Sequence, residues 1–175
     1  MSIPEPEDIG RWMARFNHAA KLFDEKYEDQ GFNDLVFMVV CGATLEAILG
    51  VGLTAHKADI DLSTYYLHNC IEAAISRKVV SREFEPALLA FKDIRNAIAH
   101  EIDYRLTPEI TTKLTNSLPE CWSNDVRATI AKIGPAVPSG TEIRIALMAL
   151  IAALDVDIRR NITYILDERD ARSGR

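Results

Sequence analysis

The sequence lacks the short motifs that mark the best-known enzyme classes. Its 175 residues contain no Gly-rich phosphate loop, no Gly-x-Ser-x-Gly and no His-Glu-x-x-His. These absences remove the sequence evidence for a P-loop enzyme, an α/β-hydrolase or a zincin protease. The four histidines stand far apart, at positions 18, 56, 68 and 100, and they supply no cluster with metal-ligand spacing. We therefore predict neither a bound metal nor a cofactor.

Cysteine is also scarce. The chain has three, Cys41, Cys70 and Cys121, with no Cys-x-x-Cys and one left over from any pairing. Such usage is typical of reduced thiols in a cytosolic protein. Residues 1–8 hold acids and two prolines but no apolar run, so they do not have the pattern of a signal peptide. We predict a cytoplasmic protein.

Basic residues are outnumbered, with 20 lysines and arginines against 26 aspartates and glutamates and a net charge of −6. This balance argues against a broad surface for nucleic acid and allows only a short footprint with local basic groups. Strand-type alternation is missing, whereas 48% of the residues are apolar, which is ample for a core. The predicted fold class is all-α: an antiparallel bundle of five to seven helices in a single domain, 1–175, with a frayed tail at 168–175.

Apolar residues at steps of three and four predict where the helices lie. We expect Pro86 in the first turn of a helix that begins at Glu85, after a separate turn capped by Ser81. Thr107 and Pro108 form another helix start, an N-cap followed by a proline. The predicted helices are 8–28, 35–53, a third from 61 or 63 to 78, 85–103, 108–117, 122–133 and 141–167.

The segment 35–53 holds a single charge, Glu46, and is nearly long enough to span a membrane. Gly42, Gly50 and the lack of flanking basic residues favour a buried central helix instead. Glu46 then has two interpretations. It is either a buried carboxylate, which needs a partner such as Arg95 or Asn96, or a residue that faces the surface.

The chain is organised around the helix segment that contains Arg95, Asn96 and His100. Apolar residues at 91, 94, 98 and 102 have helical spacing. Asn96 and His100 are four residues apart and lie one above the other, with Arg95 one step round, so we expect all three to line one cleft edge. A permanent cation, an amide and a titratable imidazole are what a phosphodiester site needs. The plainer alternative is a solvated helix face.

The segment Arg95-Asn96-Ala97-Ile98-Ala99-His100 has the form Arg-Asn-x-x-x-His. It resembles the signature of the HEPN domains, helical bundles found in ribonucleases, toxin–antitoxin pairs and phage-defence proteins. The surroundings, with the pair Leu45-Glu46 on the preceding long apolar helix, are most similar to the branch that includes the mannitol operon repressor. The resemblance covers roughly residues 30 to 110.

This resemblance implies a symmetric homodimer in which two copies of the motif helix build one composite cleft. In active members the cleft belongs to a metal-independent endoribonuclease with RNA as substrate. His100 would then act as general base or acid, Arg95 would hold the scissile phosphate, and Asn96 would orient the backbone or the imidazole. Glu46 and Asp93 are the predicted supporting residues. A toxin or defence role would add an antitoxin or regulatory protein as partner, without a membrane.

Two other hypotheses remain open. The first is a non-catalytic regulator of the mannitol-repressor-like type, which would bind another protein and use the motif as a hydrogen-bonded knot at the dimer axis. No helix-turn-helix with a basic recognition helix is evident in the sequence. The second is a sensor of nucleotides or RNA ends that uses the same cleft without cleavage. An Arg95 locked to a carboxylate would favour the regulator, whereas an Arg95 open to a shared groove would favour the nuclease.

Overall fold

The computed structural model describes residues 30–56, 66–100, 106–133 and 140–173. Within these ranges the chain forms six α-helices and one 3₁₀ turn, and no strand, which confirms the predicted all-α bundle. The predicted helix 8–28 lies outside the described residues. The elements are α2 (Gln30–Ala55), α3 (Leu67–Ser76), η2 (Arg82–Phe84), α4 (Glu85–His100), α5 (Pro108–Ser117), α6 (Glu120–Ile133) and α7 (Thr141–Ser173).

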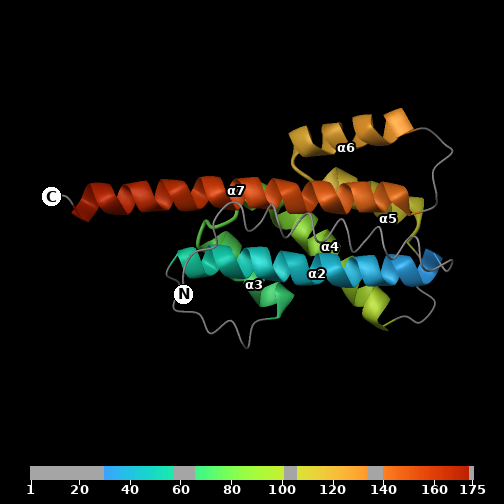
Figure 1. Cartoon of the computed structure of the whole chain (residues 1–175), viewed down its shortest axis with the longest axis horizontal. Helices are drawn as coiled ribbons and strands as arrows, with labels where there is room; N and C mark the ends of the chain where they lie inside the picture. The colour runs from blue at the N-terminus through green and yellow to red at the C-terminus, as the bar shows by residue number, and fades with distance from the viewer. Residues whose placement is uncertain (1–29, 57–65, 101–105, 134–139, 174–175) are drawn as a thin grey trace.

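Two long helices, α2 and α7, form the centre of the bundle. Figure 1 shows them side by side, and both begin at the same end of the molecule. Helix α3 packs on α2, whereas α5 and α6 pack on α7. Helix α4 contacts α2, α3 and α5 and so closes the core from a third side. The largest fully buried side chains come from α2, α3, α4, α5 and α7, among them Leu45, Leu49, Leu88, Phe91, Leu114, Leu147 and Leu150.

The stretch Val36–Ala55 of α2 has a mean hydropathy of 2.1 and is the one described helix apolar and long enough to cross a membrane. Burial in a protein core also explains this apolar character, because 56% of the stretch is buried inside the bundle. Cys41, Leu45, Leu49 and Leu53 are fully buried. This burial agrees with the central core helix that the sequence favours.

Gly52 lies where α2 closely approaches Val79 and α7. A Cβ atom at this position would lie 2.6 Å from Cγ1 of Val79 and 3.0 Å from Cγ2 of Ile158. Both neighbours are buried, so they have little room to move. A glycine is therefore required here by contact between α2, the segment after α3, and α7.

Several predicted helix starts are confirmed. Helix α4 begins at Glu85 with Pro86 in its first turn. Ser81 takes the N-cap position of the separate turn η2, but its side chain makes no capping hydrogen bond and donates to Asp157 instead. Helix α5 begins at Pro108 after Thr107, in extended conformation, at the N-cap position. Each start follows from a local rule, because a proline without an N–H is tolerated in the first turn.

Three predicted boundaries are wrong by several residues. Helix α2 begins at Gln30, five residues before the predicted start at 35. Helix α3 begins at Leu67 rather than at 61 or 63, because Tyr66 has an extended backbone, with ψ of 156°, and takes the N-cap position. At the other end of the chain, α7 continues to Ser173, where the sequence predicts a helix end at 167 and a frayed tail. Four of the six residues at 168–173 are Glu168, Arg169, Ala171 and Arg172, residue types of good helix propensity that extend a helix already formed.

A buried carboxylate fastens the segment after α3 to α7. Asp157 accepts hydrogen bonds from the backbone N–H of Ser81 and from its hydroxyl, both at 2.6 Å. The amide of Asn161 donates to Asp157 at 3.2 Å and to the carbonyl of Val79, also at 3.2 Å. A buried carboxylate is costly unless its oxygens are hydrogen-bonded, and here both oxygens have donors. This network fixes the position at which η2 and α4 begin.

We expect Asp157→Ala to lower the free energy of unfolding by about 2–3 kcal/mol, because hydrogen bonds to a charged group are lost and Ser81 is left without an acceptor. Urea denaturation followed by circular dichroism measures this change. The matched control is Val156→Ala, one residue away and 57% exposed, which should stay within about 0.5 kcal/mol of the parent. Equal unfolding midpoints for the two variants would contradict a role for this network.

The three cysteines lie in two kinds of environment. Cys41 and Cys70 are buried, and Cys121 is exposed on α6. Burial raises the pKa of the Cys41 thiol well above its usual range. Burial, together with the charge of Glu46, also raises the pKa of the Cys70 thiol. Because the thiolate is the reactive form, a raised pKa and lack of access both suppress reaction.

We therefore expect one cysteine, Cys121, to react rapidly with iodoacetamide at about pH 8, because its side chain is exposed to the reagent. Cys41 and Cys70 should be labelled only after denaturant is added. Peptide mapping by mass spectrometry after a short pulse distinguishes the three sites. Labelling of Cys41 at the same rate as Cys121 in the native protein would contradict the burial of Cys41 in the core.

Candidate phosphodiester site on helix α4

The inner face of α4 is apolar and the outer face carries the motif. Ala87, Leu88, Phe91 and Ile94 are among its buried residues, at the spacing that places them on one side of a helix. Burial of this stripe turns the remaining positions outward. Arg95, Asn96 and His100 are therefore all exposed, near the C-terminal end of the helix.

Arg95 lies against α2 rather than pointing straight into solvent. Its Nη2 is 3.9 Å from Oε1 of Glu46, and the two side chains are 46% and 41% exposed. A Cβ atom at Gly42 would lie 4.0 Å from Nε of Arg95 and 3.9 Å from Cζ of Phe91. Gly42 and Glu46 are one turn apart on α2, so the guanidinium crosses the α2 surface between them.

This arrangement settles the two interpretations of Glu46. Of its two predicted partners, Arg95 and Asn96, the contact with Arg95 is present, but the carboxylate is half-exposed and not buried. A pair with so much solvent contact contributes little to stability, typically ~0–1 kcal/mol. Asp93 is exposed as well, and its ion pair among the described residues is with Lys92, at 3.4 Å.

Asn96 and His100 occupy a different side of α4 from Arg95. They are separated by one turn and share the outward ridge. Arg95 and His100 are five residues apart, which places them about 140° apart around the helix axis. The sequence predicts that all three line one cleft edge. One copy of α4 instead presents the cation toward α2 and the amide and imidazole toward solvent.

The neighbouring face of α2 is exposed and apolar. Val39 is 62% exposed, and Ala43 and Ala47 follow at intervals of four residues, both exposed. These positions lie next to Gly42 and Glu46, so they adjoin Arg95. The exposed side of α2 and the exposed side of α4 therefore meet at the Arg95–Glu46 contact. We call this combined surface the α2–α4 face.

Sequence reasoning missed that the Arg95 side chain passes close to Gly42. This proximity depends on how α2 and α4 cross, which no local pattern encodes. The available signal was a glycine one turn before Glu46 on a helix that is otherwise rich in larger apolar residues. Over the ranges that the structure describes, no group of three or more His, Cys, Asp or Glu side chains lies close enough to hold a metal ion.

Comparison of the chain with models of protein families, with curated proteins and with solved structures finds no match.

Proposed function

We propose that this chain is a HEPN-like endoribonuclease that works without metal, as a homodimer with a composite cleft at the α2–α4 face. The observation that carries the proposal is the exposure of Arg95, Asn96 and His100 together at one end of α4. None of them is used to hold the core together. Arg95 contacts one half-exposed carboxylate at 3.9 Å, so most of its five donors remain available to a phosphate.

The proposed reaction uses the RNA's own 2′-hydroxyl as nucleophile. That oxygen attacks the adjacent phosphorus, its proton passes to a general base, and the bond from phosphorus to the 5′-oxygen breaks. The leaving oxygen receives a proton from a general acid, and the products are a 2′,3′-cyclic phosphate and a 5′-hydroxyl. An imidazole suits both proton transfers, and Arg95 would stabilise the charge on the phosphoryl oxygens.

Dimerisation would bring together catalytic groups that lie apart in a single chain. In a single copy Arg95 and His100 diverge around α4. Two copies related by a two-fold axis would place the His100 of one chain opposite that of the other, so that one serves as base and the other as acid. The exposed apolar residues Val39, Ala43 and Ala47 offer surface for that contact.

We expect the protein to cleave single-stranded RNA in excess chelator and to leave DNA intact, because DNA lacks the 2′-hydroxyl. His100→Ala should reduce the rate by ~10²–10⁴-fold and Arg95→Ala by ~10²–10³-fold. Arg95→Lys should restore little, because an ammonium does not reproduce the planar two-pronged contact. A labelled oligonucleotide assay, with mass analysis of the product ends, measures all three.

The matched controls are His68→Ala and Arg160→Ala, which remove the same side chains from exposed positions on other helices. Both controls should retain the parental rate. Activity that disappears with chelator, or that survives in both His100→Ala and Arg95→Ala, excludes the mechanism. A contaminating nuclease would give the same rate in every preparation.

The dimer has its own test. Val39→Glu should weaken association by at least about tenfold, because it places a charge in an apolar contact and like charges across a two-fold axis repel. Val156→Glu on α7 is the matched control, since Val156 is similarly exposed at 57%. Sedimentation velocity measures both. If the parent is a monomer at micromolar concentration, or if only Val156→Glu dissociates it, the composite cleft on the α2–α4 face is wrong.

The second candidate is a non-catalytic regulator of the mannitol-repressor-like type. The observation that favours it is the contact of Arg95 with Glu46, which in that case has a structural role. Such a protein would bind a protein partner through the α2–α4 face, without RNA cleavage. A parent protein that dimerises but leaves every single-stranded RNA intact would favour this candidate.

In both candidates the proposed setting is the cytoplasm. A toxin or defence component would be held in check by an antitoxin or regulatory protein.

A further inference from the structure

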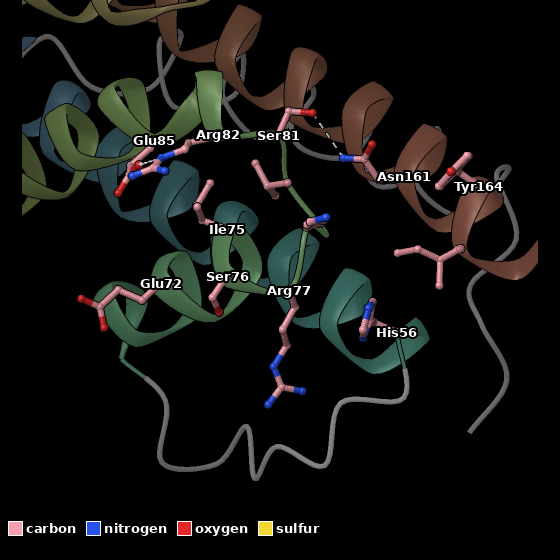
Figure 2. Close-up of a pocket in the computed structure, with 13 residues that line it drawn as sticks. His56, Glu72, Ile75, Ser76, Arg77, Ser81, Arg82, Glu85, Asn161 and Tyr164 are labelled. Atoms are coloured by element: carbon pink, nitrogen blue, oxygen red, sulfur yellow. Dashed lines mark hydrogen bonds and ion pairs between the residues drawn. The ribbon is translucent and has the colours of Figure 1, made fainter. Parts of the chain in front are cut away.

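A second surface feature lies at the opposite end of α4 from the motif. It is a groove of about 1140 Å³, lined by the end of α2, the last turns of α3, the connection to α4, and residues 161–165 of α7. Figure 2 shows His56, Asn161 and Tyr164 along one margin of this groove, and Glu72, Arg82 and Glu85 along the other. It shares no residue with Arg95, Asn96 and His100.

Three cations line the groove although the chain as a whole is acidic. They are Arg77, Lys78 and Arg82. Across the described ranges neither Arg77 nor Lys78 has an ion pair, and Arg82 contacts Glu85 at 3.5 Å while staying exposed. The other carboxylate, Glu72, is 3.2 Å from His68. The groove therefore combines a local excess of positive charge with two carboxylates at its margin.

Lys78 has an unusual backbone conformation. Its φ is 59°, and it is the one residue other than glycine with positive φ in the described part of the chain. It follows the C-cap of α3, where its N–H donates to the carbonyl of Ile75 and the N–H of Val79 donates to that of Ala74. Glycine is the usual residue at such a position, because a side chain is strained there. Strain of this kind is concentrated at functional sites.

The rest of the groove combines hydrogen-bonded polar groups with apolar lining. Asn161 and Ser81 are held by Asp157, and Ile75, Val80 and Ile165 add apolar lining. Tyr164 is 64% exposed, so its ring offers a face for stacking. Fixed polar groups, cations and an aromatic ring are the combination that binds a phosphate joined to a flat base.

We propose that this groove binds a nucleotide, with Lys78 and Arg77 at the phosphate and the base against Tyr164 and the apolar lining. A small ligand fits better than an RNA strand, because the marginal carboxylates and the net charge of −6 repel a long polyanion. The proposal does not depend on the endoribonuclease activity.

Isothermal titration calorimetry of the full chain with AMP tests the proposal. The parent should bind with a Kd below about 1 mM. Lys78→Gly should weaken AMP binding by about tenfold or more, the size of one lost charge-assisted hydrogen bond. The same variant should unfold at a temperature about 2–4 °C higher, because the strain at φ of 59° is relieved. If Lys78 had only a structural role, its replacement by glycine would not both weaken AMP binding and raise the unfolding temperature.

Arg77→Gln should also weaken AMP binding, whereas Lys132→Gln, an exposed lysine on α6, should leave it unchanged. No saturable binding of AMP up to about 5 mM, or parental affinity in Lys78→Gly, overturns the proposal. Two further titrations identify the ligand. Inorganic phosphate that binds as tightly as AMP would overturn the nucleotide assignment, and so would an RNA oligomer without terminal phosphates that displaces AMP stoichiometrically.

Discussion

The close contact between α2 and α7 is the constraint on which the rest of the structure depends. At Gly52 the two helices and Val79 come so near that a single methyl group would collide with its neighbours. Because interiors are packed at crystal-like density, this contact fixes the spacing of the central layer. Helices α3 and α4 can then bury their apolar stripes only on the sides that α2 and α7 leave open.

That central layer determines where polar chemistry is presented. Asp157 on α7 holds Ser81 and thereby sets the start of α4. The buried stripe of α4, with Phe91 and Ile94, then fixes the rotation of the helix. Once the rotation is fixed, Arg95 must lie toward α2 and Asn96 and His100 toward solvent. The candidate site is thus a consequence of core packing at the other end of the same helix.

The sequence predicts most of the fold, because helix signals are local. Pro86 and Pro108 mark helix starts through the missing N–H of proline, and both starts are where the sequence places them. The extension of α7 to Ser173 was not predicted. The charged residues at this end of α7 form no apolar stripe, and an apolar stripe is the pattern from which a sequence predicts a helix. Helix propensity alone is enough to continue a helix that has already formed.

The candidate site was predictable only in part. The exposed set Arg95, Asn96 and His100 follows from the alternation of apolar and polar positions. The pairing of Arg95 with Glu46 is predicted from the need of a buried carboxylate for a partner, whereas the observed pair is half-exposed. The half-exposed state of Glu46 and the proximity of Arg95 to Gly42 depend on the crossing of α2 and α4. The basic groove depends on α2, α3 and α7 meeting, and on a positive φ at Lys78. Neither a helix crossing nor a backbone angle of one lysine can be read from periodicity.

The contact between Arg95 and Glu46 does not oppose phosphate binding at Arg95. Both side chains remain close to half-exposed at a separation of 3.9 Å, and a pair of this kind is worth ~0–1 kcal/mol because water screens it. A charge-assisted hydrogen bond from a guanidinium to a phosphate oxygen is worth about 1.5–3 kcal/mol, and a two-pronged contact makes two of them. In the proposed endoribonuclease a phosphate would therefore win the competition for the guanidinium. Glu46 would then hold Arg95 near the exposed surface of α2 while no ligand is bound, which would reduce the conformational freedom lost on binding.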